Sequence, residues 1–231
     1  MPFLASLLGL SRGQAAEPTA VPTPMHAPAA RSRWAMQASL CAALLLAGCA
    51  GPEPRATLIT LPSLAGSAAA PAAAVASAPA RWLAVRRVQL PEHLQARRVR
   101  FRADASTVGE WPHAFWAERL EVAVSREFTA ALAQRLGAWQ VCEGTCASAP
   151  PHAVLLVEFS TLDFRRDRGR LTGSARLLVT TGDAQARVLL AWQEAIDEPA
   201  PREGPQGQAE ALGAALQRLA DAAARRLASL P

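Results

Sequence analysis

Apolar and polar residues alternate in several stretches of the chain, and this pattern predicts β-strands. The segment WLAVRRVQL (82–90) has an apolar start and ends before a proline, which predicts one strand. The segment RRVRFRAD (97–104) alternates with a period of two, which predicts a strand with one buried and one solvent-exposed face. Its charged face fits either an edge protected by charge or a phosphate-binding surface. The charged residues are Arg98, Arg100 and Arg102.

Three further segments predict an antiparallel meander. AVLLVEFSTLDF (153–164) begins with a continuous apolar run, which predicts a central strand covered on both faces. RRDRGR (165–170) has the residues of a tight hairpin turn, and LTGSARLLVT (171–180) returns antiparallel. RVLLAWQEA (187–195) is the third strand, and DEPAPREGPQG (197–207) predicts a flexible loop.

A period of three to four residues predicts two helices. In the segment 115–137 an apolar stripe recurs at this spacing and stops at Gly137, which suits a C-terminal cap. A second stripe closes the chain, between Leu212 and Leu230. The order of elements predicts an α+β fold, with a mostly antiparallel sheet and two main helices packed on one face. The first stripe consists of Trp116, Leu120, Ala123, Val124, Phe128, Ala131, Leu132 and Leu136.

The N-terminal part has the pattern of a secretory signal. Two arginines precede an apolar stretch from about Ala35 to Ala47, and small residues follow it. This stretch is shorter than the ~20 residues that span a bilayer, and the two prolines that follow Cys49 disfavour a core helix. Leu-Ala-Gly-Cys at 46–49 resembles the bacterial lipobox, whose cysteine becomes the acylated first residue of the mature protein. An aspartate directly after the lipobox cysteine would resemble an inner-membrane retention signal. Ala50 occupies this position instead, which favours the outer membrane.

These features predict the organisation of the chain. Residues 1–48 form the leader, and translation starting at Met25 gives a leader of ordinary length. Residues 49–80 form the lipidated N-terminus and an Ala/Pro-rich linker, which lacks enough apolar surface to order itself. Residues 81–231 form the globular domain, onto whose sheet Thr57–Leu61 pairs back. Several acyl chains anchor a protein stably, because each buried methylene adds ~0.8 kcal/mol.

Charge gives little support for a nucleic-acid partner. The 231 residues carry 24 basic and 19 acidic side chains, and every basic one is arginine. Three arginines and one acid precede Cys49, so the part from Cys49 onward carries 21 − 18 = +3. An excess this small is typical of a mixed-charge surface, and we expect no nucleic-acid partner.

The two cysteines of VCEGTC, Cys142 and Cys146, favour a disulfide. The lipobox implies an oxidising compartment, and a turn at Gly144 brings the two Cα atoms within disulfide range. A zinc site with His152 is the alternative, but no fourth ligand lies nearby in the sequence.

No motif for catalysis occurs in the mature chain. His93, His113 and His152 belong to no recognisable nucleophile or metal arrangement, and no P-loop, Rossmann or G-x-S-x-G pattern is present. Glu118 and Glu121 flank Arg119 and fit surface charges better than a catalytic pair. We therefore expect no enzyme, no cofactor and no metal.

Several motifs in order resemble the PqiC-like auxiliary lipoproteins of ABC-type lipid-transport systems. They are the lipobox, TLITLP (57–62), VQLPEHL (88–94), WAERL (116–120) and the strand at 153–164. The resemblance covers about Cys49 to Leu230. It departs from the family in its long linker, its lack of tyrosine and its cysteine pair.

The resemblance implies a lipid-anchored docking subunit. Its partners would be an MCE-domain protein and an inner-membrane permease, in a system that moves phospholipids and supports outer-membrane integrity. The linker would provide reach from the outer membrane, and the family implies that a homo-oligomer is possible. The alternative class is an adaptor or activator of envelope assembly machinery, similar to the TolB N-terminal domain. Candidate partner contacts are Leu90, Pro91, His93, Trp116, Glu118 and Arg119, which also fit an ordinary turn and helix surface.

Overall fold

The computed structural model describes residues 55–64 and 81–230. The expected leader (1–48), the start at Met25, the acylated Cys49 and most of the expected linker lie outside the described residues. Residues 55–64 and 81–230 belong to one unit that runs from Pro54 to Pro231.

Eight strands and two helices make up the described part of the chain. The sheet is mostly antiparallel, so the predicted α+β class is confirmed. The strands are β1 (Thr57–Ile59), β2 (Arg81–Val85), β3 (Arg98–Arg102), β4 (Val108–Trp116), β5 (Trp139–Glu143), β6 (Ala153–Arg165), β7 (Arg170–Thr181) and β8 (Val188–Pro199). The helices are α2 (Leu120–Arg135) and α3 (Gly204–Leu227), and a 3-10 turn, η2, covers Glu92–Leu94.

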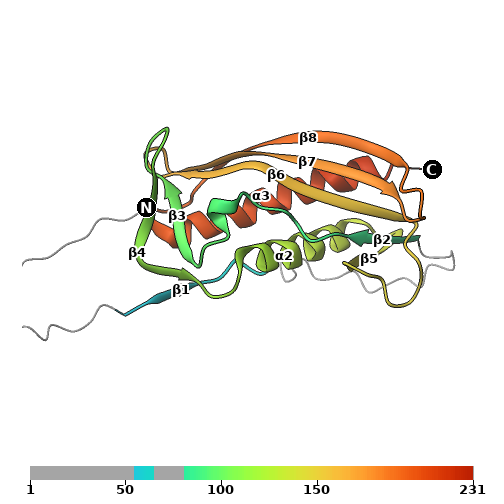
Figure 1. The fold of residues 1–231 in the computed structure, drawn as a ribbon, viewed down its shortest axis with the longest axis horizontal. Helices are drawn as coiled ribbons and strands as arrows, with labels where there is room; N and C mark the ends of the chain where they lie inside the picture. The colour runs from blue at the N-terminus through green and yellow to red at the C-terminus, as the bar shows by residue number, and fades with distance from the viewer. Residues whose placement is uncertain (1–54, 65–80, 231) are drawn as a thin grey trace, which may run out of the picture. The chain divides into compact units, whose positions relative to one another are not determined.

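The long strand β6 organises the sheet. β7 pairs antiparallel with β6 along its whole length, and β8 pairs antiparallel with β7. On the other side of β6, β2 pairs parallel with residues 153–155, and β3 pairs parallel with Arg165. β5 continues beyond β2, whereas β4 and β1 continue beyond β3. Figure 1 shows these two short arms at opposite ends of the β6–β8 meander.

One face of the sheet forms the hydrophobic core. Both helices lie on the same side of β6–β8 (Figure 1). Val154 and Leu156, on the other face of β6, are only half-buried, so the prediction of a central strand is right but that of full burial on both faces is wrong. Each large apolar side chain in the core contributes ~1.5–3 kcal/mol to folding. Fully buried examples are Val85, Val124, Phe128, Leu132, Leu155, Leu177 and Leu216.

Two strands were missed by the sequence analysis, and the first helix is shorter than predicted. Residues 108–116 form β4, and α2 begins only at Leu120, so Trp116 ends a strand instead of starting the helix. The β3–β4 pairing shifts register between Arg98 and Arg100, and His113 has a φ of 54°. Such a bulge removes the regular alternation from which a strand is predicted. The five-residue β5 was also missed.

The predicted loop at 197–207 is much shorter in the structure. β8 extends to Pro199 because its end pairs with the start of β7, where Arg170 lies opposite Pro199. The Arg170 guanidinium also donates to the Asp197 carboxylate at 2.7 Å. α3 begins at Gly204, so four residues connect the two elements.

Residues 55–64, which we call the N-terminal strap, are part of the domain. β1 pairs parallel with residues 114–116 of β4, as expected from the TLITLP pattern. The strap then contacts the helices, since Pro62 packs so closely on Gly213 of α3 that a Cβ added there would lie only 3.3 Å from it. Leu64 is 4% exposed. The described domain therefore includes residues 55–64 as well as 81–230, because the strap fills a place in the core.

Candidate functional site

The VQLPEHL segment (88–94) follows β2, includes η2 and is hydrogen-bonded to β6. The Gln89 N–H donates to the Val157 carbonyl at 3.0 Å, and the Phe159 N–H donates to the Gln89 carbonyl at 2.9 Å. The Val88 N–H donates to the buried hydroxyl of Ser125 in α2 at 2.9 Å. The segment is therefore a strand-like connection supported from both sides.

A polar cluster holds the end of this segment. His93 Nε2 lies 3.3 Å from Asp163 Oδ1, and Arg102 Nη2 donates to the same oxygen at 2.8 Å. Arg100 Nη1 donates to the His93 carbonyl at 3.1 Å. These contacts orient η2 against β3 and β6, so His93 is a positioned side chain at the surface.

The structure separates the predicted contact residues into two groups. Leu90 is 8% exposed and Trp116 is 3% exposed, and both belong to the hydrophobic core. Their prediction as partner contacts is wrong, because their side chains lie beneath the surface. Pro91, His93 and Glu118 are half-buried, and Arg119 is exposed. These four residues define what we call the loop–helix surface.

Ion pairs at the start of α2 shape this surface. Arg126 donates to both carboxylate oxygens of Glu118 at 2.8 Å, and its Nε donates to Glu127 at 3.1 Å. The bond from Arg126 lowers the pKa of Glu118 below its ordinary value, and the bond to Glu118 raises the pKa of Arg126. Arg119 lies 3.4 Å from Glu121 and is 62% exposed at its side chain. Charge-assisted hydrogen bonds are stronger than neutral ones, so these bonds fix the geometry of the Glu118 and Arg126 side chains.

Glu127 was not singled out from the sequence, although it is the buried acid of α2. Its side chain is 7% exposed and accepts the N–H of Leu64 at 2.7 Å. The signal for it is positional, because Glu127 lies on the helix between Val124 and Phe128, both of which are fully buried. A carboxylate at such a place requires partners inside the domain.

The arginine face of β3 is occupied by internal ion pairs. Glu110 of β4 pairs with Arg98 at 3.4 Å and with Arg100 at 3.1 Å. Asp163 of β6 pairs with Arg102. Since β3 lies between β4 and β6, the face belongs to an interior strand, and its charges are matched by neighbouring acids.

Cys142 and Cys146 form a disulfide in the structure, with their Cα atoms 5.4 Å apart. The bond closes the turn after β5, where Gly144 has a φ of 70°. Across residues 55–64 and 81–230, no group of three or more His, Cys, Asp or Glu side chains is placed to hold a metal ion. The helices of the same residues include none that is long and apolar enough to cross a membrane.

Two solved structures have a similar fold. A crystal structure of an uncharacterized protein matches with a TM-score of 0.61 and 17% identity, covering 75% of this chain and 99% of that chain. A crystal structure of a Xanthomonas campestris protein of the DUF330 family matches with a TM-score of 0.51 and 13% identity, covering 74% and 90%. At these identities the likeness shows the fold alone. No curated protein sequence matches the chain.

The α+β domain thus has a known fold. The family of ABC-type transport auxiliary lipoprotein components matches residues 63–224, and the chain belongs to this family. The resemblance to PqiC-like proteins is confirmed. Members of this family are auxiliary components of transport systems, and the family is not a known enzyme family. Membership associates this chain with an ABC-type transport system of the cell envelope.

Proposed function

We propose that this protein is the lipid-anchored docking subunit of an MCE/ABC-type system that moves phospholipids between membranes and supports outer-membrane integrity. The observation that carries this proposal is the family match over residues 63–224. The lipobox at 46–49 adds support, because it supplies an acylation site at Cys49. The protein would lie on the periplasmic face of the outer membrane, and its acyl chains, palmitate among them, would enter that membrane.

The partner in this proposal is an MCE-domain protein, together with its inner-membrane permease. The loop–helix surface is the candidate contact, since Pro91, His93, Glu118 and Arg119 are accessible and positioned by internal bonds. Its mixed charge suits a protein partner, because charged groups set specificity and association rate at interfaces. A preorganised surface also loses little conformational entropy on binding.

Co-purification from native membranes in mild detergent tests this function. We expect the wild-type chain to retain an MCE-domain protein, and Arg119→Glu to reduce its recovery several-fold. Arg187→Glu is the matched control, because Arg187 is also an exposed arginine but lies before β8, away from the loop–helix surface. Recovery of cell-wall or secretion machinery in place of an MCE protein would favour the adaptor alternative. Native mass spectrometry of the same sample reports whether the chain is a homo-oligomer.

A further inference from the structure

The strap determines how close the domain lies to its lipid anchor. β1 is paired with β4 from Thr57 onward, eight residues after Cys49. Eight residues span at most about 29 Å even when fully extended. The expected linker cannot add to this reach, because Leu64 and Arg81, which border residues 65–80, belong to the same domain.

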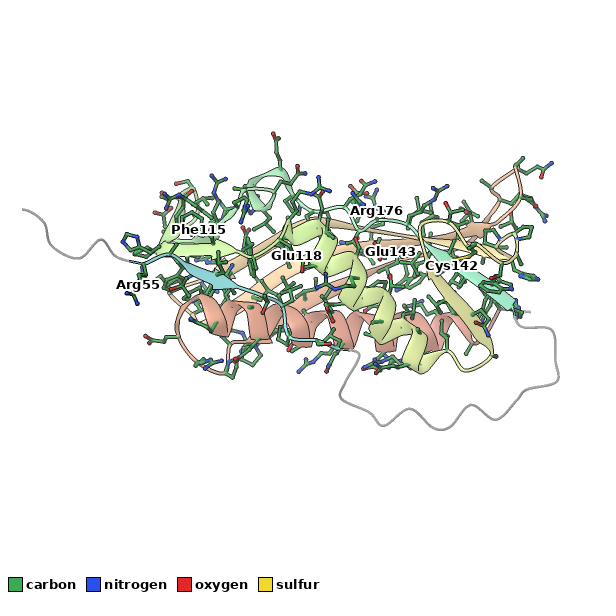
Figure 2. All side chains as sticks on the ribbon, turned by 90° about the horizontal axis from the view of Figure 1, so that it is seen from below. Arg55, Phe115, Glu118, Cys142, Glu143 and Arg176 are labelled. Atoms are coloured by element: carbon green, nitrogen blue, oxygen red, sulfur yellow. A yellow bond between two sulfur atoms is a disulfide. The ribbon has the colours of Figure 1, made fainter. Side chains whose placement is uncertain are left out.

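The surface next to this attachment point combines apolar and basic side chains. Leu58 of β1 pairs with Phe115 of β4, and Phe115 pairs with Arg98 of β3, so the three residues form one row across the sheet. Leu58 is 61% exposed, and the Arg98 guanidinium, which also pairs with Glu110 at 3.4 Å, lies 4.9 Å from the centre of the Phe115 ring. Arg55 is exposed at the start of the strap. Figure 2 shows Arg55 and Phe115 near one end of the domain, with Cys142 toward the other.

These residues have the chemistry of a membrane interface. Exposed leucine and aromatic rings enter the boundary between headgroups and acyl chains, and arginines hold their guanidinium groups at the level of the phosphates. Exposed leucine alone is ordinary on a protein surface, as Val188 at 62% exposure shows. The place of Leu58 beside the attachment point is what distinguishes it.

We propose that Arg55, Leu58, Arg98 and Phe115, here called the Leu58 surface, rest on the phospholipid leaflet that holds the acyl chains of Cys49. This inference rests on the proposed acylation. It commits the domain to one orientation, in which the β1–β4 arm faces the lipid and the β2–β5 arm with its disulfide faces away. The partner of the Leu58 surface is the lipid leaflet itself, since the short connection to Cys49 keeps this surface close to the leaflet that holds the acyl chains.

Headgroup quenching of the acylated full chain tests the orientation. A fluorescent amino acid replaces Leu58 in one sample and Val188 in the other, and each protein is reconstituted into vesicles of phosphatidylethanolamine and phosphatidylglycerol with nitroxide headgroups. Val188 is the matched control, because its exposure is nearly equal and its strand pairing, through Thr180 and Val154 to Ala84, places it at the β2–β5 arm. We expect several-fold stronger quenching at position 58.

Equal quenching at the two positions, or stronger quenching at 188, overturns the orientation while leaving the anchor intact. We expect the wild-type chain to float with the vesicles and Cys49→Ala not to float. A wild-type chain that does not float overturns the proposed acylation and this inference with it. The two failures are therefore distinguishable.

Insertions provide a second, independent measurement. A flexible Gly/Ser segment placed between Ala50 and Pro54 lengthens the connection to the anchor, so quenching at position 58 falls. The same segment placed between residues 65 and 80 leaves it unchanged, because that segment begins and ends on one domain. The opposite pattern contradicts the inference, since the reach would then come from the expected linker.

Discussion

The Glu127 carboxylate of α2 accepts the backbone N–H of Leu64 at 2.7 Å, although the two residues are 63 positions apart. Gln134 of the same helix donates to the Leu64 carbonyl at 2.9 Å, so both backbone groups of Leu64 are bound by α2. The strap is thereby joined to the core by α2. In this protein residues 55–64 are a structural element of the domain.

Removing the Glu127 carboxylate tests the strap. We expect Glu127→Ala to lower the free energy of unfolding by about 2–3 kcal/mol, because it leaves the Leu64 N–H buried without a partner. Urea denaturation followed by circular dichroism measures the change. Glu118→Ala is the matched control, since Glu118 binds the same Arg126 at a more exposed site, and we expect a loss below about 1 kcal/mol. Equal losses in the two variants would contradict the role of Glu127.

The disulfide supplies a second prediction. Replacing both Cys142 and Cys146 by serine is expected to lower the free energy of unfolding by about 2 kcal/mol, because the bond closes only a short loop. Thermal unfolding with and without a reductant measures this loss. The double variant should not respond to the reductant, whereas the wild type should approach the stability of the variant. A wild type indifferent to reduction would argue against the bond in solution.

Asp104 predicts a pH dependence. Its carboxylate accepts the N–H groups of Ser106 and Thr107, each at 2.8 Å, and these bonds lower the pKa of Asp104, the Ser106 bond most strongly. A depressed pKa contributes stability above the unfolded pKa of about 3.9, and this contribution is lost as the pH falls through the folded pKa. NMR titration of the carboxyl carbon measures the pKa directly. Asp104→Asn should make stability fall less steeply below about pH 4, and an unchanged slope would refute the assignment.

The Asp163 carboxylate is expected to position His93. Asp163→Ala removes the partner of both His93 and Arg102, so we predict a loss of about 1–2 kcal/mol in unfolding free energy. Under the proposed function, recovery of the MCE partner should also fall. Asp167→Ala is the control, because it removes an exposed acid in the β6–β7 turn that pairs with Arg165. Reduced recovery in both variants to the same degree would speak against a specific role for His93.

Sequence reasoning identified the elements whose patterns are regular. The β6–β7 hairpin was predicted from its turn residues, and Gly169 there indeed has a φ of 58°. β4 was missed because it contains Pro112 and a left-handed His113, which interrupt the alternation while the strand still pairs on both sides. The predicted strand Thr57–Leu61 ends before Leu64, which the structure shows to be buried. The burial of Leu64 depends on helices that lie far along the chain, so the local sequence does not predict it.

The candidate site was predicted less well than the fold. VQLPEHL and WAERL are patterns in which apolar and polar residues are mixed, and the pattern does not tell which of them reach the surface. Leu90 and Trp116 serve the core, whereas His93 and Arg119 remain accessible. The row of Leu58, Phe115 and Arg98 was not found, since it forms only when three strands pair side by side.

The most direct test of the central claim is mass spectrometry of the mature protein isolated from native outer membranes. The account predicts that the chain begins at Cys49 and carries a diacylglyceryl thioether and an amide-linked acyl chain on that residue. A mature chain that begins elsewhere, or that has an unmodified thiol at Cys49, would contradict it.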